Sequence, residues 1–220
     1  MKKRILTIAL AVALLATCFG GTYAYLKDTH VVKNTFATGN VYITLDEAKV
    51  KLDETTGNLI KDGNERISTS KADHEVEQNY HLFPDMVVTK DPTIHVDDTS
   101  EDAWIAAIIT ISGTTVDMRE HISGGILESN KVTVVESVDG STRTLYVYVN
   151  EKVAKTANEK DIVLFETLTI PAAWGNSEMD AIDGMTIDVT AYAVQSNGFD
   201  TCVTAMQTAY GNVFPTSQNP

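Results

Sequence analysis

Trp104–Ile111 constrains the fold more than any other stretch of the chain, because seven of its eight residues are apolar. Successive side chains of a β-strand point to opposite faces, so this stretch is apolar on both of its alternating faces. A central strand that is covered on both sides has this composition. We therefore predict that Trp104–Ile111 is the central strand of the protein core.

Further apolar or alternating stretches occur on both sides of this strand, with turn signals about every 8 to 12 residues. The expected strands are Val41–Leu45, Tyr80–Val88, Asp91–Val96, Lys131–Val138, Thr144–Val149, Ile162–Ile170 and Met185–Gln195. Asp139-Gly140 predicts a hairpin, because an Asp-Gly pair favours a tight turn between two strands. Roughly seven to nine strands of this kind predict a mainly β fold, a jelly-roll-like antiparallel β-sandwich with a few short helices.

Three segments are expected to be helical. Thr115–Ile122 has a threonine at its N-cap, and Asn176–Asp183 ends at a glycine. Thr201–Tyr210 has small and apolar residues three and four positions apart, from Cys202 to Ala209, which places them on one face of a helix. Lys49–Asn79 differs from all of these, because its many charged and turn-forming residues predict a solvated excursion or a ragged hairpin.

The N-terminal segment predicts a secretion signal peptide. Lys2–Arg4 supply a positive n-region, Ile5–Phe19 an apolar h-region and Thr22–Ala24 a small-residue cleavage site. The apolar run has 15 residues, whereas a membrane-spanning helix needs about 20. We therefore expect cleavage after Ala24, so that Tyr25 begins a mature protein without a stable membrane anchor.

A lipid anchor at Cys18 is the alternative, because Leu15–Cys18 is similar to a lipoprotein cleavage site. Thr17 fits this alternative poorly, since a smaller residue is usual at that position. After cleavage at Ala24, Cys202 is the only cysteine, so no disulfide can form within the chain although an exported protein meets oxidising conditions. Its small-residue surroundings favour a buried apolar role over that of a nucleophile.

Charge and length limit the functions of the exported part. Removing residues 1–24 leaves 196 of the 220 residues and moves the formal net charge from −13 to −16, because it removes three positive and no negative charges. Nucleic acid and anionic lipid repel a chain this acidic, so we expect no nucleic-acid partner. The remaining length suits one well-filled core, which we assign to residues 41–220 as a single β-sandwich domain.

Four carboxylates gather between two expected strands, at Asp97, Asp98, Glu101 and Asp102. Calcium prefers oxygen ligands, so this cluster is a candidate calcium site. An exposed acidic turn explains the same residues with fewer assumptions, because runs of charge are usually solvated. We therefore assign no cofactor to the protein.

Zinc proteases usually hold their metal with an H-E-x-x-H pattern on one helix face, and its glutamate acts as the base. His74–Gln78 begins this pattern but has a glutamine in place of the second histidine, and His81 lies seven residues beyond His74. A loop could still bring the two histidines together. The sequence has no G-x-S-x-G nucleophile elbow either. We therefore name no catalytic residue and expect a protein that is not an enzyme.

Three stretches of the chain resemble one protein family. Thr22–Thr29 is similar to the processing site of that family, Asn34–Val41 to its N-terminal signature, and Ile187–Gln195 with Gly198-Phe199 to a late strand common among its members. The family is the TasA/camelysin family of secreted bacterial proteins, which a dedicated signal peptidase exports and which occur in biofilm matrix or on the cell surface. The resemblance covers most of the chain, and its sharpest motifs lie at the two ends.

The resemblance implies a jelly-roll fold and, for TasA-like members, fibres built by strand donation between subunits. The donor would be Tyr25–Ala37, within an N-terminal assembly segment of residues 25–40. Trp104–Ile111 and Met185–Gln195 would form the acceptor framework. The apolar anchors of the donor would be Leu26, Val31, Val32 and Phe36. The implied partners are further copies of the chain, other matrix proteins and the signal peptidase.

Other interpretations remain open. Residues 25–37 can pair within their own subunit as an edge strand, or stay frayed as chain termini often do. A cell-surface metalloendopeptidase is a second function, because camelysin has been described as a metal-dependent protease. A monomeric accessory protein that docks on another fibre is a third. We expect the structural role, that of a secreted matrix protein that forms or joins fibres.

Overall fold

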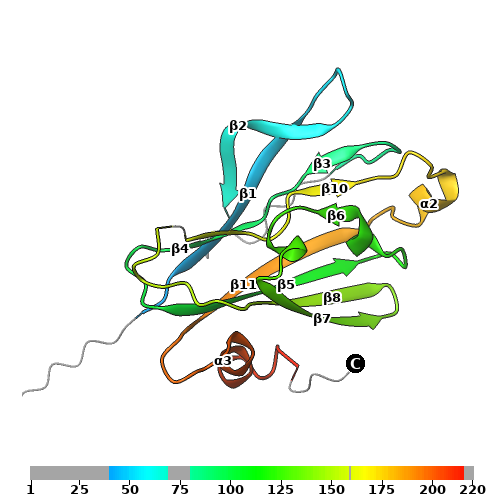
Figure 1. Ribbon diagram of the computed structural model, residues 1–220. Helices are drawn as coiled ribbons and strands as arrows, with labels where there is room; N and C mark the ends of the chain where they lie inside the picture. The colour runs from blue at the N-terminus through cyan, green and yellow to red at the C-terminus, as the bar shows by residue number, and fades with distance from the viewer. Residues whose placement is uncertain (1–39, 69–79, 159, 216–220) are drawn as a thin grey trace, which may run out of the picture. The chain divides into compact units, whose positions relative to one another are not determined.

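The computed structural model describes residues 40–68, 80–158 and 160–215, which all fall within one compact unit, Gly39–Pro220 (Figure 1). The strands are β1 Ile43–Leu52, β2 Leu59–Ser68, β3 Val87–Thr89, β4 Thr93–Val96, β5 Ala103–Ser112, β6 Ile122–Ser123, β7 Val132–Asp139, β8 Thr142–Val149, β9 Asp161–Val163, β10 Thr167–Thr169 and β11 Thr186–Gln195. The helices are η1 Met118–His121, η2 Ile126–Glu128, α2 Asn176–Asp180 and α3 Cys202–Ala209.

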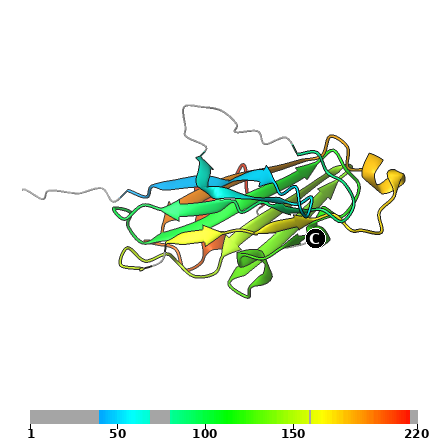
Figure 2. The same cartoon turned by 90° about the horizontal axis from the view of Figure 1, so that it is seen from above.

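The strands form two sheets that pack face to face. Sheet A has seven strands in the order β6-β10-β3-β2-β1-β4-β9, and sheet B has four in the order β11-β5-β8-β7. Neighbouring strands are antiparallel except β2 and β3, which meet in parallel at Leu59 and Val88. Figure 2 shows the strands of the two sheets overlying one another, with α2 at one end. The prediction of a mainly β, jelly-roll-like sandwich with a few short helices is confirmed.

The core lies between the sheets, and β5 passes through its centre. On one face of β5, Ile105 is fully buried and belongs to the same apolar cluster as Leu145 of β8 and Ile94 of β4. Burying a side chain of this size contributes about 1.5–3 kcal/mol. On the other face, Trp104 and Ala106 pack in a second cluster beneath α3. A central strand covered on both faces is therefore confirmed.

Three further elements have the predicted positions. β7 and β8 form a hairpin whose turn contains Gly140, at a φ of 59° that favours glycine. β11 occupies all but the first residue of the predicted late strand. α3 begins after Thr201, whose side-chain oxygen accepts a hydrogen bond from the N–H of Thr204 at 3.2 Å and so caps the helix.

The single strand predicted over Ile162–Ile170 is wrong, because two shorter strands, β9 and β10, take its place. β9 pairs with β4 and β10 pairs with β3, in one continuous register. Pro92 lies between β3 and β4 and has no N–H to donate. The N–H of Leu164 bonds to the carbonyl oxygen of Pro92 at 2.9 Å, but Pro92 donates no hydrogen bond in return, so the ladder is incomplete at this level.

Two other predicted elements are too long. Of the strand predicted over Tyr80–Val88, only the end belongs to β3, because Asp85 has a φ of 69° and turns the chain just before it. The helix predicted over Thr115–Ile122 is reduced to the single turn η1. Its N-cap is Asp117 rather than a threonine, since the Asp117 carboxylate accepts the N–H of Arg119 at 3.2 Å.

β1 and β2 form a long hairpin that projects beyond the other strands of sheet A (Figure 1). Its turn is held by Asp53, whose carboxylate accepts hydrogen bonds from the N–H of Thr55 at 3.0 Å and the hydroxyl of Thr56 at 2.7 Å. The pairing has one register shift, so the hairpin is irregular. A ragged hairpin within Lys49–Asn79 is thus confirmed through β2, and residues 69–79 lie outside the described part.

Candidate functional site

Several predicted site residues lie outside the described part of the chain. They are the cleavage pair Ala24 and Tyr25, the donor anchors Leu26, Val31, Val32 and Phe36, and the incomplete zinc pattern His74–Gln78. Cleavage, strand donation and the role of this pattern therefore stay predictions. His81, the other histidine considered for zinc, is exposed in the segment that leads to β3.

The candidate calcium ligands lie in the turn between β4 and β5, and two of them pair with lysines of the segment after β8. Glu101 pairs with Lys155 at 2.7 Å, and Asp102 pairs with Lys152 at 2.9 Å. The carboxylate of Asp102 also accepts the N–H of Lys155 at 2.8 Å. This backbone hydrogen bond, together with the ammonium group of Lys152, lowers the pKa of Asp102.

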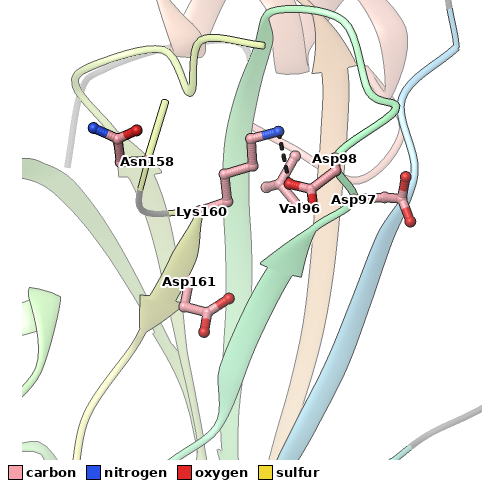
Figure 3. A pocket seen from close by; sticks show the side chains of 6 residues that line it. All are labelled: Val96, Asp97, Asp98, Asn158, Lys160 and Asp161. Carbon is pink, nitrogen blue, oxygen red and sulfur yellow. Dashed lines mark ion pairs between the residues drawn. The ribbon is translucent and has the colours of Figure 1, made fainter. Parts of the chain in front are cut away.

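The other two candidates, Asp97 and Asp98, line an open polar pocket of about 420 Å³ beside β9 (Figure 3). Asp98 pairs with Lys160 at 3.2 Å, whereas Asp97 points away from that pair. Hydrogen bonds from the hydroxyl and N–H of Thr99 lower the pKa of Asp97. Across residues 40–68, 80–158 and 160–215, no group of three or more His, Cys, Asp or Glu is placed to hold a metal ion. Asp97 and Asp98 are exposed, whereas Glu101 and Asp102 are half-buried. An acidic turn without a cofactor stays the prediction.

Cys202, the one cysteine in the described part of the chain, is the first residue of α3. It is 3% exposed, and its thiol donates to the carbonyl oxygen of Ile105 at 3.1 Å. Burial raises the pKa of the Cys202 thiol to about 12, so the thiolate that a nucleophile requires does not form near neutral pH. Cys202 therefore packs as a small apolar residue of the second cluster.

The feature that can bind a partner is the edge of sheet B formed by β11. In the described part of the chain, β11 pairs with β5 alone, through ten consecutive positions from Thr186 opposite Ser112 to Gln195 opposite Ala103. A strand at the edge of a sheet has one row of N–H and C=O groups without a sheet partner. Such a row accepts a further strand from another chain.

The hydrogen-bond pattern identifies the groups that form this outer row. The N–H of Ser196 donates to the carbonyl oxygen of Asp102 at 2.7 Å and extends the β11–β5 ladder by one step. Bonding alternates along an antiparallel ladder, so even-numbered residues of β11 bond to β5 and odd-numbered residues turn outward. The outward residues are Ile187, Val189, Ala191, Ala193 and Gln195. The carbonyl oxygen of Ala193 accepts a hydrogen bond from the Tyr210 hydroxyl at 3.2 Å, which agrees with this assignment.

The β11 edge has few of the devices by which proteins protect an open strand. Its ten residues include no lysine and no proline, and Asp188 is the one charged residue among them. Thr186, Asp188 and Thr190 are exposed, while Ile187 and Val189 pack against the core. The N-terminal half of β11 therefore has a regular outward row of backbone groups with little electrostatic protection.

β7, the opposite edge of sheet B, is protected by charge. Its outward residues include Glu136, by the alternation that the bond from the N–H of Asn150 to the carbonyl oxygen of Lys131 fixes. Glu136 pairs with Arg119 of η1 at 2.8 Å and with Arg143 of β8. β11 is the longer of the two edges and has fewer charges.

Sequence reasoning found this strand but not its edge. Met185–Gln195 was expected within an acceptor framework because of the family resemblance, whereas an edge exists only because no neighbour pairs beyond it. The alternating pattern of a strand depends on which of its two faces is buried, and it is the same for an edge strand and for a strand inside the sheet. The contact between Tyr210 and Ala193 had no local signal in the sequence.

Comparison with known proteins gives one match. Residues 1–61 match a family model described as Camelysin metallo-endopeptidase. The matched part comprises the N-terminal segment, β1 and the start of β2, and it includes Thr22–Thr29 and Asn34–Val41, two of the stretches that carry the resemblance. No curated protein and no solved structure shows a significant match to the chain. None of the helices in the described ranges is sufficiently long and apolar to span a membrane.

Proposed function

We propose that this chain is a secreted structural protein that forms or joins fibres of an extracellular matrix, by adding a strand of a neighbouring subunit to its β11 edge. The observation that carries the proposal is the edge of the ten-residue strand β11, with outward backbone groups at Ile187, Val189 and Ala191 and one charged residue. The family match over residues 1–61 supports export and a location on the cell surface or in the matrix.

Strand addition joins subunits mainly through the backbone. Each added hydrogen bond contributes about 0.5–1.5 kcal/mol net, and alternate side chains of the added strand set the register. The donor Tyr25–Ala37 carries four apolar anchors, Leu26, Val31, Val32 and Phe36. In the precursor this donor remains joined to the signal peptide. Cleavage after Ala24 frees the donor, so assembly can begin only after the signal peptide has been removed.

Electron microscopy of two purified forms tests the dependence on processing. One form begins at Tyr25, and the matched control keeps a few additional residues ahead of Tyr25. We expect fibres from the first form and monomers from the second, because only a free donor reaches the neighbouring edge. Monomers from both forms would reject self-assembly and leave the accessory role. That role predicts sedimentation of the protein only after fibres of another matrix protein are added.

Deleting residues 25–37 from the mature form tests the donor directly. We expect the truncated chain to stay a folded monomer, because the two sheets and the core lie within the described ranges. Far-UV circular dichroism and size-exclusion chromatography measure folding and mass. Fibres that grow from the truncated chain at the rate of the mature form would show that strand donation by this segment is wrong.

A metalloendopeptidase is the second candidate function, and the description of the matching family model favours it. The enzyme would bind zinc tightly at one ion per chain and would cleave a protein substrate in a chelator-sensitive manner. Elemental analysis of the purified mature protein and a casein-cleavage assay measure the two properties. Absence of both zinc and cleavage would reject this candidate without affecting the structural one.

A further inference from the structure

The two halves of β11 differ in what covers them. In the N-terminal half, alternate residues from Thr186 to Thr190 are exposed, whereas no residue from Ala191 to Gln195 is exposed. The C-terminal half packs beside α3 and the segment that follows it, through Tyr192 and Val194 on the face that carries the second apolar cluster. The outward backbone row is therefore equally regular in both halves but unequally accessible.

Tyr210 blocks the outward row within the C-terminal half, at Ala193. Its hydroxyl donates to the carbonyl oxygen of Ala193 at 3.2 Å, and Ala193 is the next outward residue after Ala191. An added strand that continued past Ala191 would need this same oxygen as an acceptor.

The Tyr210 side chain is fixed where it lies. Its ring packs edge-on against Tyr192 at a centroid distance of 5.1 Å and lies 6.5 Å from the ring of Phe214, which is 1% exposed. Its backbone N–H bonds to the carbonyl oxygen of Met206 at 2.8 Å and closes the last turn of α3. Displacing the hydroxyl from Ala193 therefore requires movement within a packed aromatic cluster.

We infer that Tyr210 is a stop for strand addition, which confines an added strand to the edge at Ile187, Val189 and Ala191 and thereby fixes its register. The inference rests on the proposed function. Registers that differ by two residues keep the same side chains on the same face, so facing alone does not separate them. A fixed end to the accessible edge separates them, because a strand whose pairing ends at Ala191 cannot shift by two residues to pair with Ala193.

Residue-resolved hydrogen exchange on fibres of the mature protein tests the stop. In the unchanged protein, assembly should slow exchange of the N–H groups of Ile187, Val189 and Ala191 at least tenfold and leave that of Ala193 unchanged. In fibres of Tyr210→Phe, which keeps the ring and removes the hydroxyl, exchange at Ala193 should also slow. Tyr192→Phe makes the same change on the neighbouring ring and should behave as the unchanged protein.

The outcomes separate the inference from the function on which it rests. Slowing that already includes Ala193 in the unchanged protein would overturn the inference alone, and so would a Tyr210→Phe pattern identical to the unchanged one. Fibres in which no N–H of β11 slows would overturn the inference together with β11 as the acceptor edge. Thermal unfolding of both variants before assembly checks that neither result comes from a loss of folding.

Discussion

His95 joins two carboxylates from the strands on either side of β4. Its Nε2 lies 2.9 Å from Asp46 of β1, and its Nδ1 lies 2.7 Å from Asp161 of β9. Partial burial acts against the charged ring, but the hydrogen bonds and charges of Asp46 and Asp161 outweigh it and raise the pKa of His95. Arg66 also holds Asp46, at 2.6 Å, so the carboxylate of Asp161 depends more on the histidine.

The raised pKa of His95 predicts a stability contribution that depends on pH. The contribution is fully present below the unfolded-state pKa of about 6.5 and is lost as pH rises through the higher folded-state pKa. His95→Gln should therefore lower the free energy of unfolding by about 1 kcal/mol at pH 5 and by little at pH 9. Urea unfolding across this range measures it. His81→Gln, at an exposed histidine, is the control, and an equal loss for His95→Gln at both pH values would contradict the prediction.

Asp91 is a buried carboxylate that holds β1 and β2 to the start of β4. It is 4% exposed, accepts the N–H of Ala48 at 2.7 Å, and pairs with Lys61 at 2.7 Å and Arg66 at 3.2 Å. Burial alone would raise its pKa. The hydrogen bonds from Lys61 and Ala48 and the charge of Arg66 outweigh burial, and the pKa of Asp91 is lowered.

Asp91→Asn should destabilise the protein by about 1–3 kcal/mol at pH 7, because it removes the negative charge that pairs with two cations and accepts a buried N–H. A lowered pKa contributes stability above the unfolded-state value of about 3.9, and this contribution disappears as pH falls through the folded-state pKa. The two proteins should thus converge in stability near pH 2. Denaturant unfolding at both pH values measures this. Asp98→Asn, at an exposed carboxylate, should change neither value, and a constant difference for Asp91→Asn would exclude the electrostatic explanation.

At the scale of elements, the alternation along β11 separates two kinds of backbone group. Ala191 turns its N–H outward, and Thr190 directs its N–H to β5. Proline removes the N–H of the residue it replaces and is tolerated in edge strands where that N–H faces solvent. Neighbouring positions of one strand therefore distinguish loss of assembly from loss of folding.

Ala191→Pro should leave a folded monomer and weaken fibre growth about fivefold or more, since an outward donor is lost and one hydrogen bond is about 1 kcal/mol. Thr190→Pro should instead lower the free energy of unfolding by about 2 kcal/mol, because it breaks the ladder to β5. Light scattering measures fibre growth, and urea unfolding measures the free energy of unfolding. Normal fibre growth of folded Ala191→Pro would exclude β11 as the acceptor.

Residue periodicity and turn residues predict a helix or strand correctly where the element does not depend on a distant part of the chain. Trp104–Ile111, the hairpin at Asp139-Gly140 and the late strand are correct because their periodicity and turn residues agree with their environment. The division of Ile162–Ile170 was not predictable, since it depends on Pro92 in the segment between β3 and β4. The β11 edge was not predictable either, because it depends on the order of the strands in sheet B, in which β11 stands at one end.

At the scale of the whole molecule, net charge opposes association of identical copies. The full chain has a formal net charge of −13, and removal of residues 1–24 makes it −16. Like charges on two approaching copies repel one another over a distance that salt sets, about 30 Å at 0.01 M and 10 Å at 0.1 M ionic strength. Strand addition therefore has to overcome a long-range repulsion before short-range hydrogen bonds form.

Fibre growth of the mature protein should accordingly become faster as salt rises from about 0.01 M to 0.1 M, because screening shortens the repulsion. Light scattering at a fixed protein concentration measures the growth rate, and unfolding curves at each salt concentration check that stability is not the cause. Slower growth in added salt would indicate that attraction between opposite charges, rather than repulsion between like charges, controls the encounter of two copies.

The position of β1 determines how a fibre of such subunits would carry tension. β1 follows the N-terminal segment directly and pairs with β2 on one side and with β4, from Ile43 opposite Val96 to Asp46 opposite Thr93, on the other. A pull from a neighbouring subunit through that segment would act along β1, in shear, so all of these hydrogen bonds would share the force. Single-molecule pulling from that end should show a high rupture force, and sequential low-force release would show unzipping instead.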